Sequence, residues 1–305
     1  MNKLGGITAI LVILLGSLFA SQAIFAMSST NYYINWDSIN VGGTDFSSST
    51  NYWMHDTLGE LSTGFSSSTN YWMSAGYRLP WKSDYIHFSI SGQDNSTQVA
   101  YTSFDNVNKQ VVVAAAAGYS VGNYIAVVEN VGQGQKVAVG KIINIAGNTF
   151  TVDKWDGDNA TMSPVPVGAN DYVYKLSTNT VDLQTLTTST VKTGVSRTDV
   201  HTNAPNGYNI NIIVDGQLRS GADDINPVTD GTVTAGDEEY GVQTVGLTAS
   251  GTNDFQLTTT GQRVQVSSSP AVNDRIGVIY KAAISSATSG GSYSQTAAFY
   301  LTANF

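Results

Sequence analysis

The stretch that decides the fold is TNAPNGYNINIIVDG, residues 202–216. Its Ala-Pro-Asn-Gly segment, residues 204–207, consists of residues that favour turns. From Tyr208 to Val214 apolar and polar residues alternate, so that Tyr208, Ile210 and Ile212 share one face. Strict alternation is typical of a strand with one buried face. We therefore predict a turn followed by a core strand.

Similar runs occur along most of the chain. We expect strands at Tyr85–Ile90, Gln110–Ala117, Tyr124–Val128, Lys136–Ile145, Thr149–Val152, Tyr172–Leu176, Gly277–Ile284 and Thr296–Phe305. The tripeptide Ala146-Gly147-Asn148 lies between two apolar runs, which indicates a hairpin. No convincing 3.6-residue period is found after the N-terminus, so we expect almost no helix. The sequence thus predicts an all-β protein, with a sandwich after Val181 and a small β-barrel or roll at 107–177.

A repeat precedes these runs. SSTNYYI at 28–34 returns as SSTNYWM at 48–54 and again at 67–73. The Ser, Thr and Asn residues favour turns, whereas the aromatic and apolar residues that follow them favour strands. We expect each unit to form two short strands, in a meander or in a ladder laid on a partner.

The aromatic residues of the repeats have two interpretations. They could stack on the apolar faces of sugars and bind carbohydrate, or they could form the apolar face of the meander itself. A fragment this small needs most of its aromatic side chains for its own core. The candidate ligand-binding residues are Tyr32, Tyr52, Trp53, Tyr71 and Trp72.

The first 26 residues predict export. Lys3 precedes an apolar run over residues 7–20, and small residues follow at Ala23 and Ala26. This order is typical of a cleaved signal peptide. The alternative is an uncleaved anchor, but the run is short for a span of about 20 residues. No later run is long enough, so we expect an extracellular or cell-surface protein with no membrane span after cleavage.

The amino-acid composition excludes several kinds of site and partner. The chain has no cysteine, which excludes disulfides and thiolate metal sites. With 14 Lys and Arg against 23 Asp and Glu, the net charge is −9. Nucleic acid is therefore not an expected partner, because phosphate binding needs a basic surface. Packed strands must supply the stability.

Motifs for catalysis are missing from the sequence. The three histidines, His55, His87 and His201, lie far apart, and no Gly-x-Ser-x-Gly elbow surrounds a serine. No Gly-rich loop carries the lysine of a phosphate site. Glutamates are few, and nothing singles out a pair for glycoside hydrolysis. We expect no enzymatic activity and no organic cofactor.

One acidic loop has the composition of a calcium site. Asp153, Asp156, Asp158 and Asn159 place hard oxygen ligands within seven residues. Their spacing departs from the D-x-[DN]-x-[DN]-G pattern, and no Glu stands at position 12. We expect at most weak calcium binding here, and a solvated turn is the alternative.

Three segments carry a family resemblance. TNAPNGYNINIIVDG, GDEEYGV and YKAAISSATSGGSYSQTAAFYLTANF, together with the SSSTNYWM repeats, resemble an uncharacterised class of bacterial secreted surface proteins. The resemblance covers residues 28–78 and about 179–305. It implies an immunoglobulin-like or pilin/spore-coat-like sandwich and carries no catalytic residue. Because 107–177 departs from it, we expect that segment to be inserted.

The expected organisation follows. Residues 1–26 are a signal peptide, 27–83 are β-repeats and a linker, 84–106 and 178–305 form the sandwich, and 107–177 form the inserted barrel. The expected function is that of a non-enzymatic structural or interaction protein. It would associate with itself or with other surface proteins, through strand addition. The alternatives are an adhesin that binds polysaccharide through the repeats and, from the alternating residues 299–305, an outer-membrane β-barrel.

Export gives the first prediction. We expect the mature chain to begin shortly after Ala23 or Ala26, because signal peptidase cleaves after small residues. Mass analysis of the N-terminus of secreted material measures this directly. An intact Met1 in protein purified from its native location would contradict it.

Overall fold

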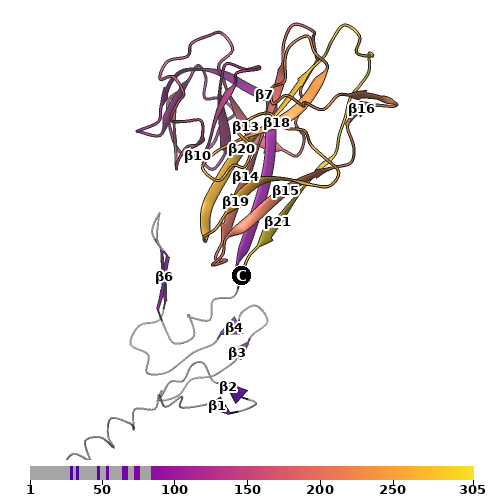
Figure 1. The fold of residues 1–305 in the computed structure, drawn as a ribbon. Helices are drawn as coiled ribbons and strands as arrows, with labels where there is room; N and C mark the ends of the chain where they lie inside the picture. Colours follow the sequence, from indigo (N-terminus) through magenta and orange to yellow (C-terminus); the bar gives the residue numbers. More distant parts are fainter. Residues whose placement is uncertain are drawn as a thin grey trace, which may run out of the picture. The chain divides into compact units, whose positions relative to one another are not determined.

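The computed structural model describes residues 84–305 and, before them, only six short strands (Figure 1). These strands form antiparallel pairs, β1 with β2, β3 with β4 and β5 with β6. Each pair flanks one Thr-Asn of the repeat. Their bounds are β1 Ser28–Ser29, β2 Tyr32–Tyr33, β3 Ser47–Ser48, β4 Trp53–Met54, β5 Gly64–Ser67 and β6 Trp72–Ala75. The chain divides into one unit up to Lys82 and a second unit from Ser83 to Phe305.

The all-β prediction is confirmed. Within residues 84–305 every regular element is a strand, and the strands pair antiparallel. In the described part of the chain no helix is long and apolar enough to cross a membrane. The bounds are β7 Ile86–Asp105, β8 Gln110–Val113, β9 Tyr124–Glu129, β10 Lys136–Ala146, β11 Thr149–Val152, β12 Asp156–Gly157, β13 Tyr172–Thr178, β14 Lys192–Thr202, β15 Tyr208–Val214, β16 Leu218–Ser220, β17 Asp223–Ile225, β18 Glu239–Val245, β19 Gln262–Ser267, β20 Ala271–Ala283 and β21 Ala297–Ala303.

Two sheets form a sandwich. In the first, the opening part of β7 lies beside β14, followed by β20 and β18. In the second, β15 lies between β19 and β21. Alternate residues of β15 point into the shared core, as the pattern from Tyr208 to Val214 predicts. The largest cluster of buried apolar residues lies between these sheets and includes Ile210, Ile212, Ile276 and Val278.

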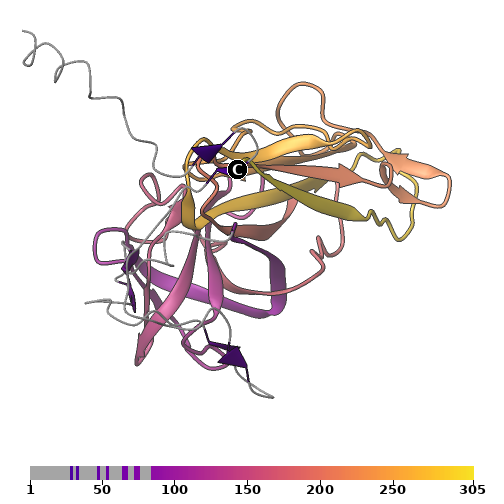
Figure 2. The ribbon, with the colours of Figure 1, turned by 90° about the horizontal axis from the view of Figure 1, so that it is seen from below.

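The second part of β7 belongs to a closed barrel. The ring runs β7, β8, β11, β10, β9 and β13, and β13 pairs with β7 to close it. Phe104, Ile125 and Phe150 belong to its core. In Figure 2 these purple and magenta strands gather beside the orange and yellow strands of the sandwich.

The barrel begins earlier than the sequence indicates. We expected residues 84–106 to belong to the sandwich, but β7 changes partners at Gly92, which pairs with both Ser196 and Thr178. Residues 93–105 then pair with β13 and β8 inside the ring. The sequence predicts that this strand stops after Ile90, at Ser91 and Gly92, yet β7 continues to Asp105 as one 20-residue strand shared by the sandwich and the barrel.

Strands β14 and β20 are buried on both faces. Their inner residues face the sandwich core, and their outer residues face the barrel. Val195 and Ile279 pack there against Val137 and Val139 of β10. The barrel therefore serves as a third layer over the first sheet.

The outer face also buries Arg275. Its side chain is fully buried, with Nη2 2.9 Å from Asp153 Oδ1 and Nε 2.9 Å from Asp156 Oδ2. Nearby, the Arg197 guanidinium lies 3.4 Å from the centre of the Tyr124 ring, whose hydroxyl donates to Asp199 at 2.7 Å. These contacts join β20 and β14 to the barrel through buried and half-buried polar groups.

Replacing Arg275 tests this junction. We expect Arg275→Ala to lower the free energy of unfolding by about 3 kcal/mol, because removing one partner leaves buried carboxylates uncompensated. Chemical denaturation measures the change. Arg219→Ala is the control, since Arg219 and Asp215 form an exposed pair whose loss costs less than about 1 kcal/mol. Equal losses in the two variants would contradict the assigned role of Arg275.

Candidate strand-docking groove

One side of the sandwich is closed by loop segments. Tyr240 of β18 exchanges backbone hydrogen bonds with Asn226 and Val228, and Val242 does so with Phe255. The outer edge of β19 bonds in the same way to Thr248 and Ser250. A segment from 248 to 255 therefore covers both edges on this side.

The opposite side is open. In the described chain, residues 86–91 of β7 pair only with β14, and β21 pairs only with β15. Segment 248–255 bonds to the edges of β18 and β19, so those two edges lie on one side of the sandwich. The unpaired edges of β7 and β21 therefore lie together on the opposite side. Figure 1 shows both strands running to the same end of the sandwich, where the C-terminus lies. Unpaired edges present free backbone donors and acceptors to an added strand.

Apolar side chains on the open side are only partly covered. Ile86 and Ile90 share the inner face of β7 with Phe88, which packs on the sandwich core, yet they are 45% and 47% exposed. On β21, Phe299 and Leu301 pack on the same core and are half-buried. Inner-facing residues in a complete sandwich are normally covered by a neighbouring strand. The exposure here is what a missing strand would leave.

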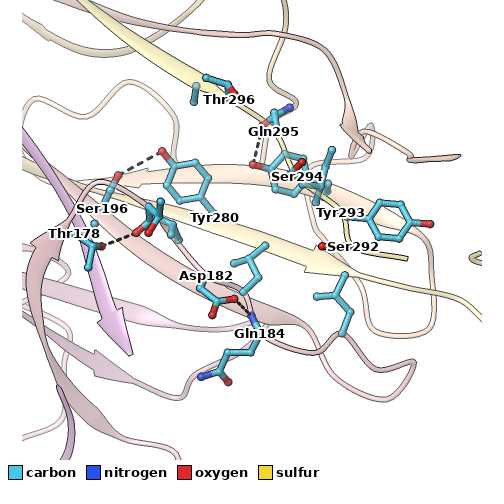
Figure 3. Close-up of a pocket in the computed structure, with 18 of the residues that line it drawn as sticks. Thr178, Asp182, Gln184, Ser196, Tyr280, Ser292, Tyr293, Ser294, Gln295 and Thr296 are labelled. Atoms are coloured by element: carbon cyan, nitrogen blue, oxygen red, sulfur yellow. Dashed lines mark hydrogen bonds between the residues drawn. The ribbon is translucent and has the colours of Figure 1, made fainter. Parts of the chain in front are cut away.

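A groove of 860 Å³ lies at this side of the sandwich (Figure 3). Ile90 and Phe299 line it from the two unpaired strands, and Ser196, Tyr240 and Tyr280 line it from the first sheet. Its remaining lining residues come mainly from two segments, 178–186 and 288–297, and from Leu218 and Ile284. The groove is thus continuous with the open edges and reaches the sandwich core.

Two glycines allow segment 178–186 to lie against the sheet. A Cβ on Gly92 would stand 2.6 Å from the Thr180 carbonyl oxygen, and one on Gly194 would stand 2.4 Å from a methyl of Val181. Both distances are shorter than real contacts allow. Val181, Leu183 and Leu186 consequently pack on the sandwich core. This packing sets one wall of the groove.

The groove contains neutral polar groups. Tyr240 donates to Gln295 Oε1 at 3.0 Å, and the Gln295 amide donates to the Gly216 carbonyl at 2.7 Å. Burial raises the pKa of Tyr280 to about 12 and raises that of Tyr240 further, so both hydroxyls stay protonated at neutral pH. Asp182, the one charged residue among the described lining, accepts a hydrogen bond from the Gln184 amide. This chemistry suits an uncharged chain segment better than an ionic ligand.

The aromatic candidates of the repeats are only partly described. Tyr32, Trp53 and Trp72 lie in β2, β4 and β6, whose backbone pairing alone is described. Tyr52 and Tyr71 fall outside the described residues. Carbohydrate binding by these five residues therefore stays a prediction.

The acidic loop has other partners. Asp153 and Asp156 accept hydrogen bonds from Arg275, and Asp156 also pairs with Lys154 at 2.8 Å. Asp158 Oδ2 accepts from the Val137 amide at 3.0 Å, and Asn159 donates to Asn106. Burial is the main cause that raises the pKa of both Asp156 and Asp158. Across the described residues no group of three or more acidic or histidine side chains is placed to hold a metal.

Two of the histidines meet across strands. His87 and His201 are opposite each other in the pairing of β7 with β14, with ring centres 5.6 Å apart. His201 Nε2 lies 3.6 Å from Asp199, and burial lowers its pKa. His201 shares the outer face of β14 with Arg197 and Asp199, and His87 lies opposite it on β7, so both histidines lie away from the groove.

The groove itself was not visible in the sequence. The alternation of Ile86, Phe88 and Ile90 predicts a strand, but it does not say that one edge is unpaired. Ser196, Tyr240 and Tyr280 belong to three strands, and only the fold brings them together. No protein-family model, no curated protein and no solved structure matches the chain.

Calcium binding at the acidic loop can be measured directly. Because Arg275 and Lys154 already neutralise Asp153 and Asp156, we expect 1 mM Ca²⁺ to stabilise the protein by less than about 0.4 kcal/mol, the value for a dissociation constant above that concentration. Melting with Ca²⁺ and with chelator gives the difference. A large fall in melting temperature with chelator would identify a structural calcium site instead.

Proposed function

We propose that this protein is a non-enzymatic structural protein of the cell exterior that assembles by strand addition. The open side of one copy accepts an extended segment of a second copy. The observation that carries the proposal is the half exposure of inner-facing Ile86 and Ile90 beside two unpaired strand edges. Main-chain hydrogen bonds to those edges would supply affinity, and alternate side chains in the groove would supply specificity.

The N-terminal repeats are the proposed donor. In the third copy the sequence alternates Tyr71, Met73 and Ala75 with Asn70, Trp72 and Ser74, so a strand here would have one apolar face and one mixed face. The described pairs of this region are only two to four residues long per strand. Isolated two-stranded hairpins are at best marginally stable in water, so a partner sheet would stabilise them.

The signal-like N-terminus supports an exterior location. An exported protein without cysteine has no disulfides to hold copies together. Its net charge of −9 and its few charged residues give no basic surface for nucleic acid or anionic lipid. Strand exchange between copies requires neither disulfides nor a basic surface.

Cross-linking between copies tests the proposal, and a cysteine-free chain makes the labelling specific. One full-length variant carries Tyr300→Cys on the exposed face of β21, and a second carries Ser74→Cys. We expect a bismaleimide to join the two variants when they are mixed, because the added strand would lie beside β21. Leu247→Cys is the matched control, since Leu247 is 97% exposed and follows β18 on the closed side. Equal yields at both positions, or none at Tyr300→Cys, would refute strand addition at this groove.

Deletion of residues 28–78 gives an independent measurement. We expect the shortened protein to lose its larger mass in light scattering, because its donor segment is gone. The melting temperature should also fall toward that of the isolated copy. If mass and melting temperature both stay unchanged, the repeats are a free-standing module and the proposal is wrong.

A further inference from the structure

We infer that the floor of the groove, formed by Ser196 and Tyr280, is a socket for a tyrosine side chain from the repeats of a second copy. This inference rests on the proposed function and adds to it the residue type that the groove selects. It depends on three observations: hydroxyls at the floor with unused bonding capacity, apolar walls, and a tyrosine common to all repeats.

The floor hydroxyls are poorly paired. Ser196 Oγ donates to the Tyr280 hydroxyl at 3.5 Å, which is well beyond the usual oxygen–oxygen distance of about 2.7–2.8 Å. Among the described residues this is the only hydrogen bond of either hydroxyl, although both side chains are nearly buried. Buried hydroxyls normally find good partners. Figure 3 shows the Ser196–Tyr280 hydrogen bond, and separately the hydrogen bond that Gln295 accepts.

The walls are apolar above this floor. Leu183 and Leu186 line one side, and Phe299 of β21 also lines the groove. A site with apolar walls and a hydroxyl floor matches a ring that has an apolar body and a polar tip. Phenylalanine or methionine would fill the walls but leave the floor hydroxyls unpaired, which costs free energy.

The repeats supply one such ring in each copy. The residue after Asn is tyrosine in all three, whereas the next position holds tyrosine once and tryptophan twice. In the third copy this tyrosine, Tyr71, alternates in the sequence with Met73 and Ala75. The constant tyrosines are Tyr32, Tyr52 and Tyr71.

Removing hydroxyls tests the socket. We expect the full-length triple variant Tyr32→Phe, Tyr52→Phe and Tyr71→Phe to weaken association between copies about tenfold, since one buried hydrogen bond changes affinity by about that factor. Ser196→Ala should weaken it similarly. Because both changes remove the same contact, their combination should weaken it no further. Analytical ultracentrifugation of each variant gives the dissociation constants.

The control is Trp53→Phe with Trp72→Phe, which changes the neighbouring aromatic position and should alter association less than about threefold. Tyr280→Phe removes the other floor hydroxyl and is measured in the same way as Ser196→Ala. The melting temperature of each variant shows whether the fold is kept. If the triple variant associates like the wild type while the Tyr300→Cys cross-link forms, the socket is wrong and strand addition stands. If the losses of affinity add fully when the triple tyrosine variant is combined with Ser196→Ala, the two groups are not in direct contact and the socket is also wrong. If the cross-link itself fails, both proposals fall.

Discussion

The burial of β14 and β20 on both faces is the constraint on which the rest of the structure depends. Their inner faces complete the sandwich core, so their outer polar residues must find partners in another layer. Arg275 is the extreme case, because a fully buried guanidinium is tolerated only beside matched carboxylates. The barrel supplies Asp153 and Asp156 from one short segment, and this pairing fixes how the barrel lies on the sheet.

The same arrangement shapes the groove. Strand β13 ends beside β7 at Gly92, and the chain then crosses the sheet over Gly92 and Gly194 before it enters β14. That crossing forms one wall of the groove and leaves the edge of β7 from Ile86 to Ser91 unpaired. The open side is therefore a product of the path by which the chain leaves the barrel. The groove on this side reaches the sandwich core.

Local patterns predicted the regular strands well. Thr149–Val152 and Tyr208–Val214 have the bounds that alternation gives, because each buries one face and ends at a turn. The pattern failed in β7, because the predicted strand ends at Ile90, whereas β7 continues through Gly92, which pairs on both sides, to Asp105. It also failed in β14, whose buried Arg197, Thr198 and Asp199 look like surface residues until their partners are known. The groove depends on which edges stay unpaired, and that is a property of distant pairings.

The junction at Gly92 also determines how the barrel is attached to the sandwich. Gly92 and Thr178 are direct partners across β7 and β13, so the whole barrel leaves and returns to the sandwich at adjacent points. The barrel is therefore a single continuous segment, and the order of the sandwich strands does not depend on it. Without the segment, the buried Arg275 side chain and the apolar outer face of the first sheet would lose the layer that covers them. The chain thus joins the two parts at one point in the structure, while the burial of β14 and β20 requires both.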